Sequence, residues 1–134
     1  MLIQVNNDDI DIKKLIIEKC GKQFSLIKRI TKNNFGSSRY KLKSIKPTHS
    51  HIDLENYNDN IFLNFDLREK GIVFYFRYKN TEYVEFSPFH SLTFQSNDSS
   101  FVLQTDINSY SFEIMNKKNH KAFILKLYKF KNKN

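Results

Sequence analysis

The sequence predicts a mainly β fold of the α+β class: an antiparallel meander of about seven strands in a roll or barrel, closed by a C-terminal amphipathic helix and preceded by an extra N-terminal helix. Three observations predict it. Between residues 39 and 115, short runs of alternating apolar and polar residues recur about every 10 residues, as in all-β domains. The 13 Phe and 7 Tyr favour half-buried sheet faces. The alternation then changes to a helical period in residues 116–131.

The N-terminal third predicts one short strand and one helix. Residues 2–5 have the length of an edge strand, and an aspartate at 8, 9 or 11 can cap the helix that follows. We predict this helix over residues 10–20, because Gly21 is a natural stop and four apolar residues recur at helical spacing: Ile12, Leu15, Ile16 and Cys20. We expect this stripe to cover the strands. Residues 23–32 fit either a strand or a continuation of the helix.

The strand-rich body spans residues 39–115. It begins with a strand that Pro47 ends, and a polar connection over residues 48–60 follows. Next comes a strand over 61–67 with one apolar face, and the turn after it places Gly71 where we expect a positive φ in a bulged hairpin. Further turns are predicted at 79–82, 96–99 and 106–109.

The segment 116–131 predicts an amphipathic helix with Asn116 as its N-cap. Its apolar residues fall at 123, 124, 127 and 128, and lysines occupy most of the other positions. A closing strand over 123–127 is the alternative that the sequence leaves open. We expect the helix to cover one end of the sheet, and a helix lying on an anionic membrane is the other interpretation.

Length and composition favour one soluble domain, residues 1–134, in the cytoplasm. A chain of 134 residues has the size of a single domain, and its one cysteine cannot form an internal disulfide framework. No apolar run reaches the roughly 20 residues of a membrane-spanning helix, and the first residues lack the pattern of a signal peptide. We therefore expect no transmembrane segment.

The net charge of +8 is unevenly distributed. Residues 1–46 hold eleven Lys and Arg against four acids, and the tail from Lys117 holds seven lysines and no acid. Residues 53–113 instead hold ten acids against four basic residues. An acidic body between two basic flanks fits self-complementary packing of the flanks on the body. It also fits an electropositive surface for a partner that carries phosphate groups.

A meander of strands followed by one amphipathic helix resembles the pleckstrin-homology-like domains, including their bacterial and GRAM-like members. The resemblance covers residues 39–131 and lies in the layout of the elements. Phosphoinositide-binding members carry a basic signature across the first strand pair, and Arg39, Lys41 and Lys43 match only its first half. The helix over residues 10–20 is also an addition to the family pattern. The resemblance implies a binding scaffold, and a scaffold does not define a ligand.

Catalytic and metal-binding patterns are weak. His49, His51 and Asp53 are similar to the HxHxDH motif of metallo-β-lactamase-type hydrolases, but Leu54 stands where that motif has its last histidine. We therefore expect no metal site there and no cofactor. Cys20 lies on the apolar stripe of its helix and is expected to be an inert, buried thiol, and Ser87–Ser91 holds Ser and His without the geometry of a triad. We expect the protein not to be an enzyme.

The remaining functions are binding functions. Phe62, Val73 and Tyr75 fall on the parity opposite the predicted core face, so they form an apolar contact patch unless the helix over 10–20 covers them. We expect a scaffold module that contacts a protein partner or a second copy of itself. The alternative is binding of a polyanion, either nucleic acid or an anionic lipid surface, by basic residues of the flanks: Lys28, Arg29, Lys41 and Lys43, together with the terminal lysines.

Overall fold

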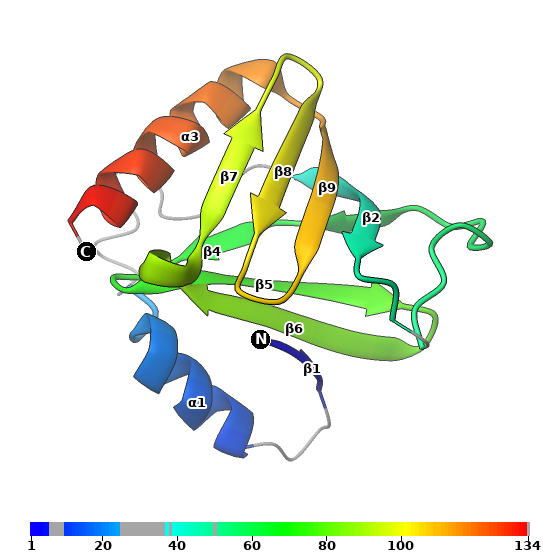
Figure 1. Cartoon of the computed structure of the whole chain (residues 1–134), viewed down its shortest axis with the longest axis horizontal. Helices are drawn as coiled ribbons and strands as arrows, with labels where there is room; N and C mark the ends of the chain where they lie inside the picture. Colours follow the sequence, from blue (N-terminus) through cyan, green and yellow to red (C-terminus); the bar gives the residue numbers. More distant parts are fainter. Residues whose placement is uncertain (6–9, 25–36, 38, 50, 134) are drawn as a thin grey trace.

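The computed structural model describes residues 1–5, 10–24, 37, 39–49 and 51–133. The described strands form two antiparallel sheets, with one helix near each end of the chain (Figure 1). This confirms the mainly β α+β class, whereas these strands do not close into the predicted barrel. In chain order the elements are β1 (Leu2–Gln4), α1 (Ile10–Cys20), β2 (Tyr40–Lys46), β3 (Ile61–Leu63), β4 (Phe65–Leu67), β5 (Gly71–Tyr78), β6 (Thr81–Pro88), the 3₁₀ helix η1 (Phe89–Ser91), β7 (Thr93–Ser96), β8 (Ser100–Gln104), β9 (Ser109–Ile114) and α3 (Lys117–Asn132).

The first sheet, which we call sheet A, has the strand order β1-β6-β5-β4. Its centre is the hairpin of β5 and β6, which pair from Gly71 opposite Pro88 to Tyr78 opposite Thr81. The predicted turn between them is confirmed, and Lys79 takes a φ of 55° there. The predicted N-terminal edge strand is also confirmed, because β1 pairs with β6.

The second sheet, sheet B, has the order β3-β2-β9-β8-β7. Two predicted turns join its last three strands, and polar side chains shape both. Asn97 Oδ1 accepts hydrogen bonds from the backbone N–H groups of Ser99 and Ser100. Thr105 Oγ1 accepts one from the N–H of Asn108. Side chains of this kind favour turns because they satisfy backbone donors locally.

The predicted strand over 61–67 is divided between the two sheets. β3 pairs with β2 in sheet B, and β4 pairs with β5 in sheet A. The alternation itself continues across Asn64, because Ile61, Leu63, Phe65 and Leu67 are all buried. The parity of the side chains was therefore predictable, but the step from one sheet to the other was not.

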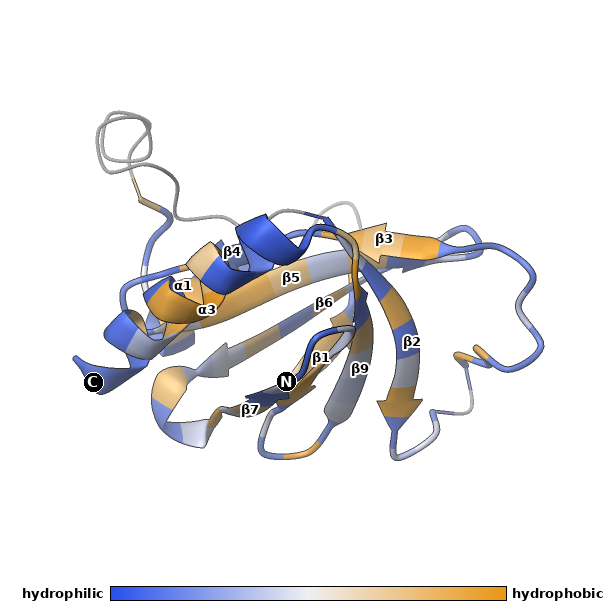
Figure 2. Cartoon of the chain, turned by 90° about the horizontal axis from the view of Figure 1, so that it is seen from above, coloured by the Kyte–Doolittle hydropathy of each residue, from blue (hydrophilic) through white to orange (hydrophobic). Residues whose placement is uncertain are grey.

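The main core lies between the sheets and is rich in aromatic rings. Phe65 stands at its centre, with ring centroids 5.0 Å from Phe112, 5.1 Å from Tyr40 and 5.5 Å from Phe123. Such ring pairs add roughly 0.5–1.5 kcal/mol beyond the burial of their area. Figure 2 shows hydrophobic residues concentrated along β5 and β3, which contribute to this layer. The predicted inward faces of these strands are thus confirmed.

Helix α1 covers the outer face of sheet A, as the sequence predicted. Its residues Ile12, Ile16 and Cys20 pack in a second cluster with Val73 and with Val84 and Phe86 of β6. The thiol of Cys20 is fully buried, and this burial raises its pKa to about 11.

Gly71 does not take the positive φ that the sequence predicted. Its role is to allow close approach between layers. A Cβ at this position would lie 2.4 Å from the carbonyl oxygen of Ser87 and 2.6 Å from Sγ of Cys20. The turn itself is formed, with Arg68 N–H donating to the carbonyl of Gly71 at 2.8 Å. Glycine is needed because the helix and the neighbouring strand leave no room for a side chain.

Helix α3 begins as predicted, because Asn116 Oδ1 accepts a hydrogen bond from the N–H of Asn119 at 3.0 Å. The alternative of a closing strand over 123–127 is wrong. The helix buries Phe123 and Leu127 in the main core, together with His120. Near its C-terminus, Lys131 Nζ donates to the carbonyl of Phe89 at 2.9 Å and also to that of Leu92. The C-terminal end of α3 is thereby fixed to the body.

Some predictions fall outside the described residues. These concern the caps Asp8 and Asp9, the choice between strand and helix for most of residues 23–32, and the basic residues Lys28 and Arg29. Within the described helices, none combines the length and the apolar character that crossing a bilayer requires.

Candidate functional site

A hollow of about 660 Å³ lies beside Tyr75, between α1 and the outer face of sheet A. We call it the Tyr75 hollow. Tyr75 and Ile17 are exposed by 40% and 42%, which is high for large apolar side chains. The described residues that line it are Lys13, Ile16, Ile17, Lys22, Gln23, Ser37, Asn64, Phe65, Asp66, Arg68 and Tyr75. Apolar area and positive charge therefore meet in one concave surface.

Arg68 gives this hollow a fixed wall. Its Nε donates to Asp66 Oδ2 at 3.1 Å, and its Nη1 donates to the carbonyl of Gly21, also at 3.1 Å. The guanidinium thereby links the end of α1 to the β4–β5 turn. Partial burial raises the pKa of Tyr75, and the nearby Arg68 partly opposes this, so the phenol stays neutral at physiological pH. The surface offers an uncharged phenol beside lysines.

The predicted patch of Phe62, Val73 and Tyr75 does not exist as one surface. Phe62 belongs to β3 in sheet B, where the guanidinium of Arg39 lies 4.1 Å from its ring centroid. Val73 is fully buried beneath α1, which is the coverage that the sequence left open. Tyr75 alone keeps an exposed position at a hollow. Coverage by α1, the alternative to a shared patch, therefore holds for Val73, and Phe62 is separated from Tyr75 because the chain changes sheets at Asn64.

The predicted basic residues of β2 differ in their surroundings. Lys41 lies opposite Glu113 on β9, and its Nζ is 3.9 Å from a carboxylate oxygen of that residue. Lys43 is exposed and stands at an irregularity in the pairing of β2 with β9. Lys41 is thus partly neutralised by Glu113, whereas the exposed Lys43 is not in an ion pair with a described carboxylate.

The histidines of residues 48–53 have other partners. His49 Nε2 lies 2.9 Å from Asn108 Oδ1, and His51 is exposed. Asp53 accepts hydrogen bonds from Asn56, and these lower its pKa. No group of three potential metal ligands occurs among the described residues.

The structure also brings together Tyr40, His120 and Ser96, which the sequence analysis did not connect. Tyr40 Oη lies 2.6 Å from His120 Nδ1, and Ser96 Oγ lies 2.6 Å from His120 Nε2. A nucleophilic triad has the same connectivity: a serine is bonded to an imidazole, and the imidazole is bonded to a third group. The direction of the hydrogen bonds decides whether it can act as one.

The Tyr40 hydroxyl is buried and has His120 as its only hydrogen-bond partner among the described residues. If it accepted from Nδ1, its own proton would be left without an acceptor in the core, which costs about 1–3 kcal/mol. Tyr40 therefore donates to Nδ1, and Nε2 carries the ring proton and donates to Ser96 Oγ. Ser96 in turn donates to the carbonyl of Asn97 at 3.3 Å.

This direction is the reverse of what a general base needs, because the imidazole must accept the proton of the serine. Burial also lowers the pKa of His120, which keeps the ring neutral at pH 7. The three residues work as a structural relay that ties α3 to β2 and β7.

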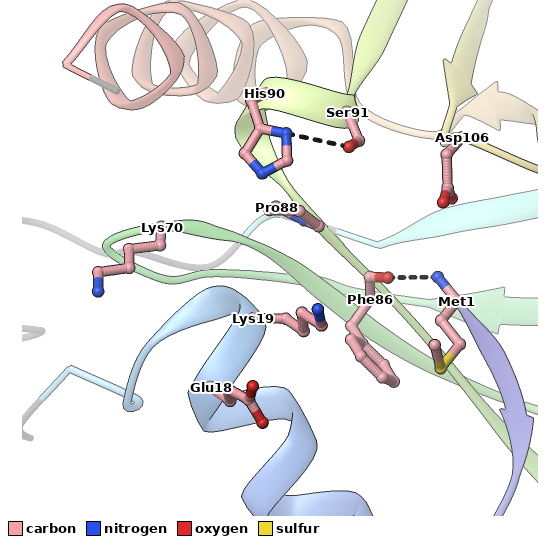
Figure 3. A pocket seen from close by; sticks show the side chains of 9 residues that line it. All are labelled: Met1, Glu18, Lys19, Lys70, Phe86, Pro88, His90, Ser91 and Asp106. Atoms are coloured by element: carbon pink, nitrogen blue, oxygen red, sulfur yellow. Dashed lines mark hydrogen bonds between the residues drawn. The ribbon is translucent and has the colours of Figure 1, made fainter.

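A second hollow, of about 630 Å³, lies between α1, β6 and η1 and contains the Ser–His pair of residues 90 and 91 (Figure 3). His90 Nδ1 lies 3.1 Å from Ser91 Oγ, and no described carboxylate bonds to this ring. Charges of both signs line it, namely Glu18, Asp106, Lys19 and Lys70. In a catalytic triad a third group orients the histidine, and the pair of His90 and Ser91 lacks such a group among the described residues.

Glu85 is the most strongly buried carboxylate of the described residues. It faces the space between the sheets, with Oε2 3.3 Å from the ammonium group of Met1. Neither of its oxygens, nor the hydroxyl of Tyr110, has a hydrogen bond of good geometry within the described part of the chain. Burial raises the pKa of Glu85, and the ammonium group opposes this only in part. The enclosed position makes it a determinant of stability.

Sequence reasoning identified Tyr75 but missed the rest of its hollow. One signal was present: Ile17 is an apolar residue beside the predicted α1 stripe. The contribution of Lys22 and Arg68 depends on tertiary contacts that no local pattern indicates.

Comparison with protein-family models and with curated proteins gives no match to this chain.

Proposed function

We propose that this chain is a non-catalytic binding module of the cytoplasm that holds a protein partner in the Tyr75 hollow. One observation carries the proposal: Tyr75 from β5 and Ile17 from α1 expose apolar area on opposite walls of one concave surface. Tyrosine is enriched at the energetic centres of interfaces, because it combines large area with few rotatable bonds. A fixed wall at Arg68 reduces the ordering cost of binding.

The lining also defines the chemistry of the partner. Lys13 and Lys22 are exposed at the hollow, whereas Asp66 is held by Arg68. A protein segment that places an apolar side chain next to a carboxylate would complement both properties. We take this occupant to be a different protein, and a second copy of this chain is the alternative occupant that the experiment distinguishes.

The non-catalytic part of the proposal rests on the polar clusters of the described residues. The relay from Tyr40 through His120 to Ser96 runs in the wrong direction for nucleophilic attack. The ring of His90 bonds to its neighbour Ser91, and no carboxylate among these residues orients it. Both observations favour binding over catalysis.

Kinship with the pleckstrin-homology-like domains is part of the same proposal. Its support is the layout: β4, β5 and β6 form a meander in one sheet, β7, β8 and β9 form one in the other, and a C-terminal helix follows. The additions are β1 and α1 on sheet A, and it is α1 that creates the Tyr75 hollow. The proposed binding surface is thus specific to this chain.

The test is affinity capture with the full chain, followed by binding measurements with the purified partner. Tyr75→Glu places a charge at the centre of the hollow and should weaken binding at least about 30-fold, the effect of losing a strong interface tyrosine. Ile107→Glu is the matched control, because Ile107 is an exposed apolar residue on the β8–β9 turn. Thermal unfolding monitored by circular dichroism verifies that both variants fold.

A partner that binds the wild type and Ile107→Glu equally, but not Tyr75→Glu, supports the proposal. Equal binding by all three proteins would refute it. Light scattering identifies the alternative occupant: a dimer that Tyr75→Glu converts to a monomer would mean that a second copy fills the hollow.

A further inference from the structure

The outward face of α3 exposes apolar residues among lysines. Leu125 and Tyr128 are exposed by 65% and 52%. The lysines that are exposed beside them are Lys117, Lys118, Lys121 and Lys129. We call these six residues the Leu125 face. The sequence analysis placed Tyr128 on the buried stripe, and this was wrong because the core takes up only Phe123 and Leu127 fully, with Ile124 half-buried.

Leu125 lies on the side of α3 opposite its buried residues. Successive residues of an α-helix are turned by about 100°, so residue 125 lies about 200° from both 123 and 127. Those two residues are the buried ones, with exposures of 2% and 0%. The helix therefore packs without Leu125, and the outward position of this side chain has no role in the core.

The lysines of this face are also unused by the fold. Within the described part of the chain, none of the four forms an ion pair with a carboxylate. Helix α3 itself contains no acid, and Asp98 on the β7–β8 turn is the acid that shares a hollow with Lys117 and Lys121. These four lysines therefore do not pair with the acidic body, which was one of the two interpretations of the charge distribution. The face keeps its positive charge for an external partner.

We infer that the Leu125 face docks on an anionic membrane surface. The lysines approach the headgroups, while Leu125 and the ring of Tyr128 enter the boundary between headgroups and acyl chains. A lysine near an anionic leaflet contributes about 1 kcal/mol, and an apolar side chain that enters the interface adds to this. Three lysines lie on the N-terminal side of Leu125 and Tyr128 and one on the C-terminal side, so cationic and apolar groups share one face, as suits peripheral binding.

The central leucine favours lipid over nucleic acid. A phosphate backbone is bound by cations and polar groups, and an aliphatic side chain at the middle of the contact has no partner there. Tyr128 is partly committed to the body, with its ring centroid 4.9 Å from that of Phe94, so it is poorly placed to stack on a base. Its hydroxyl end and exposed edge suit the water–lipid interface.

The attachment of α3 makes this face a rigid one. Asn116 caps the first turn, and Lys131 bonds to the carbonyls of Phe89 and Leu92 near the last turn. A helix that is already folded loses little conformational entropy when it meets a surface. Docking therefore needs no unfolding of α3 from the core.

The experiment is sedimentation of the full chain with lipid vesicles. Phosphatidylcholine vesicles are compared with vesicles that also contain phosphatidylserine, at low and at high salt. The wild type should sediment with the anionic vesicles only, and less at high salt. Leu125→Gln should lower the partition coefficient about tenfold, because partial burial of a leucine is lost. Ile107→Gln is the control, since Ile107 is equally exposed, at 64%, and belongs to the β8–β9 turn, which lies away from α3 (Figure 1).

A double variant, Lys121→Gln with Lys129→Gln, tests the charge. It should lower the partition coefficient roughly 30-fold at low salt, as expected for two lysines of about 1 kcal/mol each. Circular dichroism at each step verifies that the variants fold.

Absence of sedimentation with anionic vesicles would overturn the inference, as would an unchanged partition of Leu125→Gln. A gel shift with duplex DNA that depends on the two lysines but not on Leu125, without vesicle binding, would assign the face to nucleic acid instead. Because Tyr75 lies outside this face, failure here would leave the proposed protein partner untouched.

Discussion

His120 shows how one side chain can connect three elements through the direction of its hydrogen bonds. It accepts from Tyr40 on β2 and donates to Ser96 on β7, while its own backbone belongs to α3. The sequence contains all three residues but gives no reason to join them, because 80 positions separate Tyr40 from His120. Only the packing of α3 against both strands makes the relay.

The relay predicts unequal costs for the removal of its two partners. Tyr40→Phe leaves the buried Nδ1 without a donor and should lower the free energy of unfolding by about 1–3 kcal/mol. Ser96→Ala should cost much less, because Ser96 is exposed and water can replace its hydroxyl at Nε2. Urea unfolding of both variants measures the difference. If Ser96→Ala were as destabilising as Tyr40→Phe, water would not replace the serine hydroxyl at Nε2 and the expected inequality would be wrong.

Glu85 predicts a pH dependence of stability. Burial raises its pKa in the folded state above that in the unfolded chain, so the folded state binds the proton more tightly. The stability that this proton provides is present below the unfolded pKa and is lost as the pH rises through the raised folded value. Wild-type stability should therefore fall towards alkaline pH through this group.

Glu85→Gln should remove this loss. The variant keeps a carboxamide of similar size, and the Met1 ammonium group that loses its carboxylate partner still donates to the carbonyl of Phe86. We expect Glu85→Gln to be more stable than the wild type at pH 8, with the difference shrinking towards pH 4. Thermal melts across this pH range provide the measurement. A difference that stayed constant with pH would exclude Glu85 as the titrating group.

At the scale of elements, the sequence predicted what depends on local pattern. The helix over 10–20, the cap at Asn116 and the turns at Asn80 and Asn108 were all recognisable, because hydrophobic period and capping chemistry act over a few residues. The division of 61–67 between two sheets was not predictable, since alternation is the same whether the neighbouring strand belongs to sheet A or to sheet B. The reason for a glycine at position 71 was not predictable either, because the atoms that crowd it belong to α1 and β6, which are distant in the sequence.

Gly71 gives a direct test of that correction. If residue 71 had a left-handed backbone conformation, Asn would be tolerated there better than Ala. If the position is crowded instead, Asn destabilises the fold more than Ala because its side chain is larger. The Cβ contacts with Ser87 and Cys20 predict the second order. Gly71→Ala should cost about 1–3 kcal/mol of unfolding free energy, and Gly71→Asn should cost more. Chemical unfolding compares the two variants, and an Asn variant more stable than the Ala variant would restore the positive-φ interpretation.

At the scale of the whole molecule, sheet A separates the two proposed binding surfaces. α1 and the Tyr75 hollow lie on its outer face, whereas α3 packs on the core between the sheets (Figure 1). The uneven charge of the sequence predicted basic flanks, and part of that charge is indeed used within the fold, as Lys41 with Glu113 and Lys131 with backbone carbonyls show. Which lysines stay available could not be read from composition, because it depends on the face that α3 turns outward.

This separation predicts that protein and membrane can be bound at the same time. Tyr75→Glu should lose the protein partner and keep vesicle binding, and Leu125→Gln should do the reverse, because no residue is shared between the hollow and the Leu125 face. The measurement is co-sedimentation of the purified partner with anionic vesicles, which should require both wild-type surfaces. Measured one at a time, vesicle binding by Tyr75→Glu and partner binding by Leu125→Gln should both have wild-type affinity. If the partner instead released the chain from vesicles, the two surfaces would compete, and a tethering role for this module would be ruled out.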